Sequence, residues 1–291
     1  GNIDVASGMG VATSSGYIAV QTTNAGTAGV SGSIRFATGT TSVGSSGKIV
    51  LGTGDAVGGR SGDIYVSVGS GTTGNGGDVA IIGGTTSGLT GGSISLLAGS
   101  SSTSTSGSVR IRTPNGGAAG VSGSLVFSSG TSSCGSSGSI TLKSGKATAG
   151  KGGDILMSVG TSTSSLGGDI MLSSGGSSLQ TGGGMAISSG QSTATSSGSI
   201  HISTPNAGTK GVSGSLTFAT GTTSSGASGR VRILTGNAAG GKGGDIFISS
   251  GSGNAGVGGV VLLRAGEITA GTGGSVSVST GVGSSSSSGS V

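Results

Sequence analysis

The consecutive stretches GSITLKSGKATAGKG (138–152) and GDILMSVGTSTSSLG (153–167) carry the pattern that decides the expected fold. Each begins with glycine, places two apolar residues at alternate positions, and has another glycine three residues after the second apolar residue. We call the segment that carries the two apolar residues a rung and locate it by the first of them. The glycine-bounded segment between two rungs is a connection. The twenty rungs lie at Ile3, Ile18, Ile34, Ile49, Ile64, Val79, Ile94, Val109, Leu125, Ile140, Ile155, Ile170, Met185, Ile200, Leu216, Val231, Ile246, Val261, Val276 and Val291.

Successive rungs follow one another at a constant step of fifteen, except at three places where the step is longer by one residue. The longer steps recur every 91 residues, so six rungs and one extra residue form a superrepeat that is present about three times. Near copies confirm this period, namely SGSIRFATGTTSVGSSG (31–47), SGSLVFSSGTSSCGSSG (122–138) and SGSLTFATGTTSSGASG (213–229). A fixed period of this kind is typical of stacked-repeat architectures.

The composition alone would favour a low-complexity, disordered chain, because glycine supplies 71 of the 291 residues and only 7% are charged. The periodicity argues against that interpretation. Apolar residues two positions apart, many of them β-branched or aromatic, predict strands. No apolar run approaches the length of a membrane span. The net charge of +5 is spread thinly, without the basic clusters and aromatic platforms of a nucleic-acid-binding protein.

The connections between rungs tend to alternate in chemistry, which predicts how many rungs make one coil. Some are rich in Ser and Thr, such as GTSTSSLGG (160–168), and others favour Ala, Gly and a charge, such as GNAAGGKGG (236–244). We therefore expect an all-β fold, a flattened parallel β-solenoid whose coil of about 30 residues holds two rungs in two facing sheets. The array runs over 1–291 without separate domains. An antiparallel β-meander is the first alternative, and a coil made of a single rung and its connection is the second.

Motifs with a chemical role are weak in this sequence. GKGGD (150–154) resembles a phosphate-binding loop, but no helical pattern follows it. Eight acidic residues are too few for a calcium-binding repeat. His201 is the single histidine and Cys134 the single cysteine, and neither belongs to a cluster that catalysis requires. We expect no enzyme, no cofactor and no metal site.

Residues between the two apolar positions of a rung are expected to face outward, and some of them recur every 91 residues as apolar or charged spots. Apolar and acidic spots that alternate with basic ones are what side-by-side association of identical chains would use. The expected lateral contacts are Tyr65, Leu156, Phe247, Met171, Leu262, Asp63, Asp154, Asp245, Arg110 and Arg232.

Both ends are expected to support end-to-end association, because Gly1 opens a rung and Val291 stops inside one, without the polar cap of soluble solenoids. The chain has no initiator Met and no recognisable signal peptide, as expected of a processed chain or an excerpt. Exposed Ser and Thr in the connections are expected acceptors for O-linked glycans.

The two stretches at 138–152 and 153–167 resemble the long Gly/Ser/Thr-rich repeat proteins predicted in heterokont algae, and the chain is similar in cadence to β-solenoid shaft proteins of extracellular fibres. The resemblance implies a location outside the cell or at its surface. Together these observations predict a structural subunit of an extracellular filament whose partner is itself, with no nucleic acid and no membrane span. An ice-binding solenoid and the stalk of a surface adhesin are the alternatives.

Overall fold

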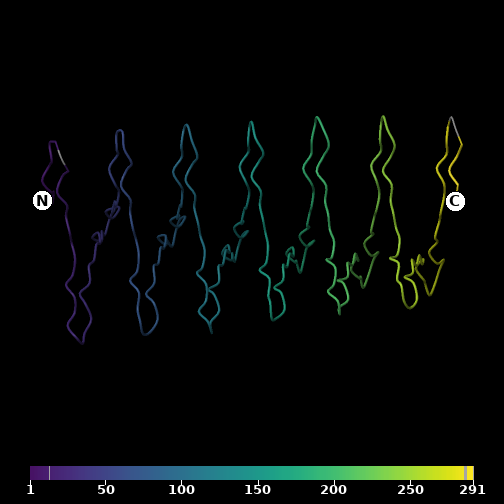
Figure 1. Cartoon of the computed structure of the whole chain (residues 1–291), viewed down its shortest axis with the longest axis horizontal. Coiled ribbons are helices and arrows are strands. Elements are labelled where there is room, and N and C mark those ends of the chain that lie inside the picture. Colours follow the sequence, from purple (N-terminus) through teal and green to yellow (C-terminus); the bar gives the residue numbers. More distant parts are fainter. Residues whose placement is uncertain (13, 285–286, 291) are drawn as a thin grey trace. The chain divides into compact units, whose positions relative to one another are not determined.

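The structure is a computed structural model that describes residues 1–12, 14–284 and 287–290. Within these ranges the backbone forms no α-helix and no β-strand. The chain divides into two units, Gly1–Gly145 and Lys146–Val291. In the described part of each unit, extended segments alternate with sharp reversals of direction (Figure 1).

The predicted parallel β-solenoid is therefore wrong for the described chain, and so are the meander and the single-rung coil, because no two segments exchange the ladder of backbone hydrogen bonds that a sheet requires. The described residues contain no buried core either. The physical reason lies in the composition of the rung. Two apolar side chains contribute about 1.5–3 kcal/mol each when fully buried, whereas ordering one backbone residue costs about 1–2 kcal/mol, and more for glycine.

Sharp bends recur along the chain at nearly the spacing of the rungs and lie in the connections. Examples are residues 42–44, 57–59 and 72–74 in the first unit, and 163–165 and 178–180 in the second. Two connections contain a hydrogen-bonded turn instead, in which the N–H of Gly120 donates to the carbonyl of Gly117 at 3.0 Å and that of Gly211 to Gly208 at 3.4 Å. These two turns are separated by one superrepeat, so the period of the sequence reappears in the backbone.

The two ends of a connection lie close to each other, and we call this close approach the neck. The neck joins the residue four positions after the first apolar residue of one rung to the glycine two positions before that of the next. A Cβ placed on Gly47 would lie 3.3 Å from the Thr38 methyl group. A Cβ placed on Gly229 would lie at the same distance from the Thr220 methyl group. Glycine avoids this crowding, because a side chain at these two positions would press against the residue opposite.

Hydrogen bonds close many necks in one of two ways. In the first, the backbone N–H of the neck glycine donates to the carbonyl of a glycine that precedes it by eight positions, at 2.8 to 3.1 Å. The described bonds of this kind run from Gly16 to Gly8, Gly92 to Gly84, Gly107 to Gly99, Gly183 to Gly175, Gly198 to Gly190, Gly274 to Gly266 and Gly289 to Gly281.

In the second way a side-chain hydroxyl replaces the backbone donor. Thr53 Oγ1 donates to the Gly62 carbonyl at 3.2 Å, Thr235 Oγ1 to that of Gly244 at 3.2 Å, and Ser250 Oγ to that of Gly259 at 3.1 Å. Where the step between rungs is the longer one, the hydroxyl reaches one position further, as Thr204 Oγ1 does to Gly214 at 3.1 Å. The necks are therefore built from small residues and short-range bonds, and they need no distant strand.

Candidate functional site

The apolar side chains expected to face outward are highly exposed in the described chain. In the rung of the second unit that begins at Ile155, this first residue is 51% exposed, Leu156 88% and Met157 62%. The same difference in exposure recurs in four other rungs. There the outward residue is more exposed than the first apolar residue of its rung, as at Tyr65, Phe247, Met171 and Leu262. Side-chain exposure thus alternates along a rung as predicted, although the less exposed side chains are still about half exposed.

Each of the three aspartates among the expected contacts forms an ion pair with a cation three positions earlier in its own connection. Asp63 binds Arg60 at 2.7 Å, and the exposed side chains of Asp154 and Asp245 bind lysines at 2.8 Å. The cations of the three pairs are Arg60, Lys151 and Lys242, which again follow one another at the period of the superrepeat.

These cations were missed in the sequence analysis, although the recurring spacing of a cation, two small residues and Asp is a readable signal. The string GKGGD (150–154), which resembles a phosphate-binding loop, contains one of these pairs. Exposed pairs of this type contribute about 0.2–1 kcal/mol. Their role is local, because each one joins the end of a connection to the start of a rung.

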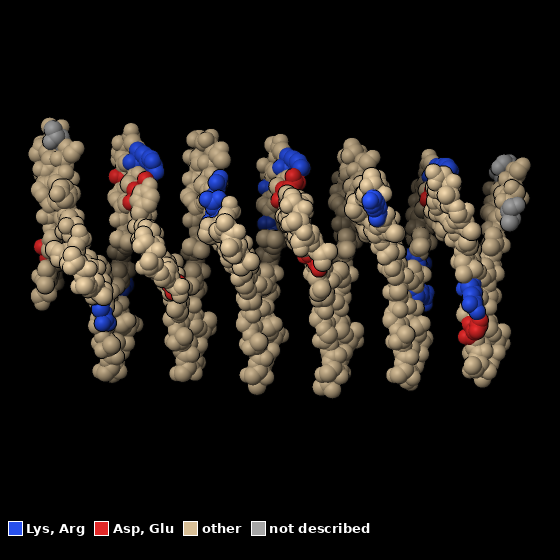
Figure 2. Space-filling view, turned by 60° about the horizontal axis from the view of Figure 1, so that its bottom comes forward, with Lys and Arg blue, Asp and Glu red and all other residues tan. Residues whose placement is uncertain are grey.

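The basic residues Arg110 and Arg232 form no ion pair within the described ranges. A fourth pair joins Arg264 and Glu267. Figure 2 shows a surface that is mostly uncharged, with acidic groups beside basic ones in several places. The ion pairs of the described residues therefore do not join the expected acidic contacts to the expected basic ones.

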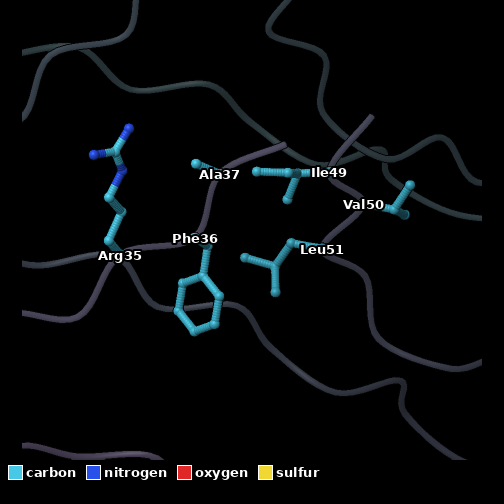
Figure 3. A pocket seen from close by; sticks show the side chains of 6 residues that line it. All are labelled: Arg35, Phe36, Ala37, Ile49, Val50 and Leu51. Carbon is cyan, nitrogen blue, oxygen red and sulfur yellow. The ribbon is translucent and has the colours of Figure 1, made fainter. Parts of the chain in front are cut away.

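One shallow hollow of about 580 Å³ lies between two successive rungs of the first unit. In Figure 3, Ile49 and Leu51 point toward the segment that carries Phe36, whereas Val50 and Arg35 point away from the space between the segments. All of these residues are exposed. Apolar side chains of one rung thus point toward the neighbouring rung without being enclosed, which leaves an apolar surface open to solvent.

The described ranges hold a free thiol and no cluster of metal-binding side chains. No group of three or more His, Cys, Asp or Glu residues there is placed to hold a metal ion. Cys134 is a free, exposed thiol in the bend at 133–135. Among the same residues, no helix is long and apolar enough to cross a membrane.

Most hydroxyl groups in and just before the bends are exposed, and several of them hold the backbone. Ser162 Oγ accepts a hydrogen bond from the N–H of Ser165 at 3.0 Å, and Ser192 Oγ accepts one from that of Thr195 at 2.9 Å. Bonds of this kind stabilise turns locally. The expected O-glycosylation of these connections stays a prediction, for which the peptide that spans Thr161 to Ser165 is the informative one.

Comparison with known protein families, curated proteins and solved structures finds no match for this chain. The resemblance to repeat proteins of heterokont algae and extracellular fibres therefore stays a prediction, as does the location that it implies.

Proposed function

We propose that this chain is a structural protein that acts by associating with copies of itself, in an assembly outside the cell. The observation that supports it is the exposure of its apolar residues: among those described, no large apolar side chain is less than 45% exposed. Burial of apolar surface contributes about 25 cal/mol per Å². A single copy leaves its apolar surface exposed, so contact between copies would bury this surface and lower the free energy.

The repeated register supports association among many copies rather than one tight dimer. Rungs recur at a nearly constant spacing, so a contact made by one rung can be made again by the next. Each contact is weak, but linked contacts raise the effective concentration of their neighbours and add in free energy. We place the contacts at the exposed apolar spots Tyr65, Leu156, Phe247, Met171 and Leu262.

The end-to-end mode expected from open solenoid ends loses its basis, because the described chain contains no hydrogen-bonded ladder to extend. Association through side chains does not need one. The extracellular location rests on the sequence resemblance alone.

Sedimentation of the purified chain over a range of concentrations tests the proposal. We expect the sedimentation coefficient to rise with concentration as copies associate. A triple variant, Tyr65→Ser, Leu156→Ser and Phe247→Ser, should raise the concentration at which association begins several-fold.

A matched control replaces the exposed valines of three connections, Val30→Ser, Val121→Ser and Val212→Ser. These residues also follow the period of the superrepeat and are at least as exposed, but they lie outside the rungs. This control should associate like the unmodified chain. A single monomeric species at every concentration would overturn the proposed function, and an equal effect of both triple variants would contradict the assignment of the contacts to the rungs.

A further inference from the structure

Two connections contain the dipeptide Asn–Gly, at Asn75–Gly76 and at Asn115–Gly116. Both asparagines are exposed. Glycine after asparagine allows the following peptide nitrogen to reach the side-chain amide, because no Cβ obstructs the approach and the backbone rotates freely. The two sites have the same reactive groups and differ in their surroundings.

We propose that Asn75 is a site of spontaneous deamidation, which converts it to aspartate and isoaspartate, whereas the turn that follows Asn115 protects that residue. Water or hydroxide removes the proton from the Gly76 peptide nitrogen, which attacks Cγ of Asn75. The new C–N bond closes a five-membered succinimide while the Cγ–Nδ2 bond breaks, and ammonia leaves after it takes up a proton. Water then opens the ring at either carbonyl, so no oxidant and no cofactor is required.

The backbone around Asn75 is free to reach the geometry of ring closure. Nothing lies within 4 Å of the position of a Cβ on Gly76, and Gly74 has a φ of +87° in the bend at 72–74. Within the described structure no hydrogen bond holds the N–H of Gly76 or the side chain of Asn75. Glycine on both sides of Asn75–Gly76 leaves the segment wide conformational freedom.

The backbone after Asn115 is held instead. A Cβ on Gly116 would lie 2.7 Å from the carbonyl carbon of Val121 and 2.9 Å from the Gly120 oxygen, so this glycine packs against the returning chain. The Gly117–Gly120 turn closes the loop with a hydrogen bond of 3.0 Å. Pro114 before the site fixes its own φ. Rotation of the Asn115 backbone toward ring closure must therefore break this packing.

Reaction at Asn75 changes the charge and the length of its connection. A carboxylate appears three positions before Asp78, which places two negative charges in one short segment. Isoaspartate also adds one carbon to the backbone path. The neck that follows is closely packed, because a Cβ on Gly77 would lie 2.9 Å from the Val68 Cγ1 methyl group. The modified chain thus carries a more acidic connection with a disturbed neck.

Peptide mapping by mass spectrometry after incubation of the intact chain in mildly alkaline buffer tests the proposal. Tryptic cleavage at Arg60, Arg110, Arg112 and Lys143 separates the sites, since residues 61–110 and 113–143 each hold one asparagine and no glutamine. We expect the mass gain of an amide-to-acid exchange to accumulate at Asn75 several-fold faster than at Asn115. Enzymatic methylation of isoaspartate should label the 61–110 peptide.

Two controls separate chemistry from structure. Gly76→Ala should slow the reaction at Asn75 to the slow rate of Asn24–Ala25 and Asn206–Ala207, which lie one superrepeat before and after the Asn115 site. Concentrated urea should raise the rate at Asn115 to that at Asn75, because it releases the turn. A stable amide at Asn75, or equal rates at the two sites in the native chain, would overturn the proposal.

Discussion

At the scale of the residue, the neck glycines have a steric role that could not be predicted from the rung pattern. Each lies two positions before a rung, and most of those described face the Cβ of a residue nine or ten positions earlier. At Gly168 the approach is close, because a Cβ there would lie 2.7 Å from Val159 Cγ1. The residues opposite are accordingly Ser, Thr, Ala or Gly in most necks.

This contact predicts that a disulfide can bridge a neck. A Cβ on Gly198 would lie 3.5 Å from that of Ser189, within the range that disulfides adopt. In a Cys134→Ser background, Ser189→Cys with Gly198→Cys should oxidise rapidly within one chain, as mass spectrometry of the alkylated protein can show. Ser189→Cys with Ser199→Cys closes a loop of nearly equal length with the second cysteine displaced by one position. Equal oxidation rates for the two pairs would argue against the neck.

At the scale of the element, the connections and their necks, rather than the rungs, carry most of the hydrogen bonds and ion pairs of the described chain. Backbone bonds close some necks and Thr or Ser hydroxyls close others, and exposed ion pairs join several connections to the rung that follows. The kind of closure depends on the place in the superrepeat, since the Gly–Gly bonds from Gly92, Gly183 and Gly274 recur at its period. Connections therefore differ in how firmly they hold their backbone.

Amide hydrogen exchange measured by NMR can detect this difference. Gly138 and Gly198 both lie in the sequence SSGSI, so their intrinsic exchange rates are the same. The N–H of Gly198 donates to the carbonyl of Gly190 at 2.9 Å, whereas the N–H of Gly138 donates no backbone hydrogen bond in the described structure. A bond of this kind contributes about 0.5–1.5 kcal/mol, so we expect Gly198 to exchange several-fold more slowly. Indistinguishable rates would mean that the backbone bond is not populated in solution.

At the scale of the whole molecule, the chain combines a high apolar exposure with a low charge. The net charge of +5 arises from 13 cations and 8 anions over 291 residues, which gives weak repulsion between copies. We therefore expect apolar contact to be the dominant influence on the proposed association between copies. Solution conditions that strengthen or weaken the hydrophobic effect should act on association in opposite directions.

Light scattering at fixed protein concentration checks this expectation. Ammonium sulfate should raise the scattered intensity and urea should lower it, because sulfate strengthens apolar burial and urea solvates apolar and peptide groups. Sodium chloride at moderate concentration should have a smaller effect, since few charges are available to be screened. Association that dissolves in moderate sodium chloride but persists in urea would show that charges, not apolar groups, hold the copies together.

Part of the candidate site could be predicted from the sequence. The exposure of Tyr65, Leu156 and Phe247 follows from their place between two apolar residues, because alternation is a local property of an extended chain. The partners of Asp63 and Asp154 were not predicted, because the composition of a connection does not state which of its charged side chains meet. The predicted solenoid failed because alternation states which way side chains point and not which segments pair.

The sequence by itself determined where the chain bends and where it approaches itself. Those features depend on glycine, Thr and Ser close to one another along the chain, and on the sterics of a missing Cβ. Only the tertiary structure decided that the rungs remain unpaired and their apolar side chains uncovered. Pairing of distant segments must offset the entropy of ordering a glycine-rich backbone, and two apolar side chains in each rung contribute too little to do so within a single copy.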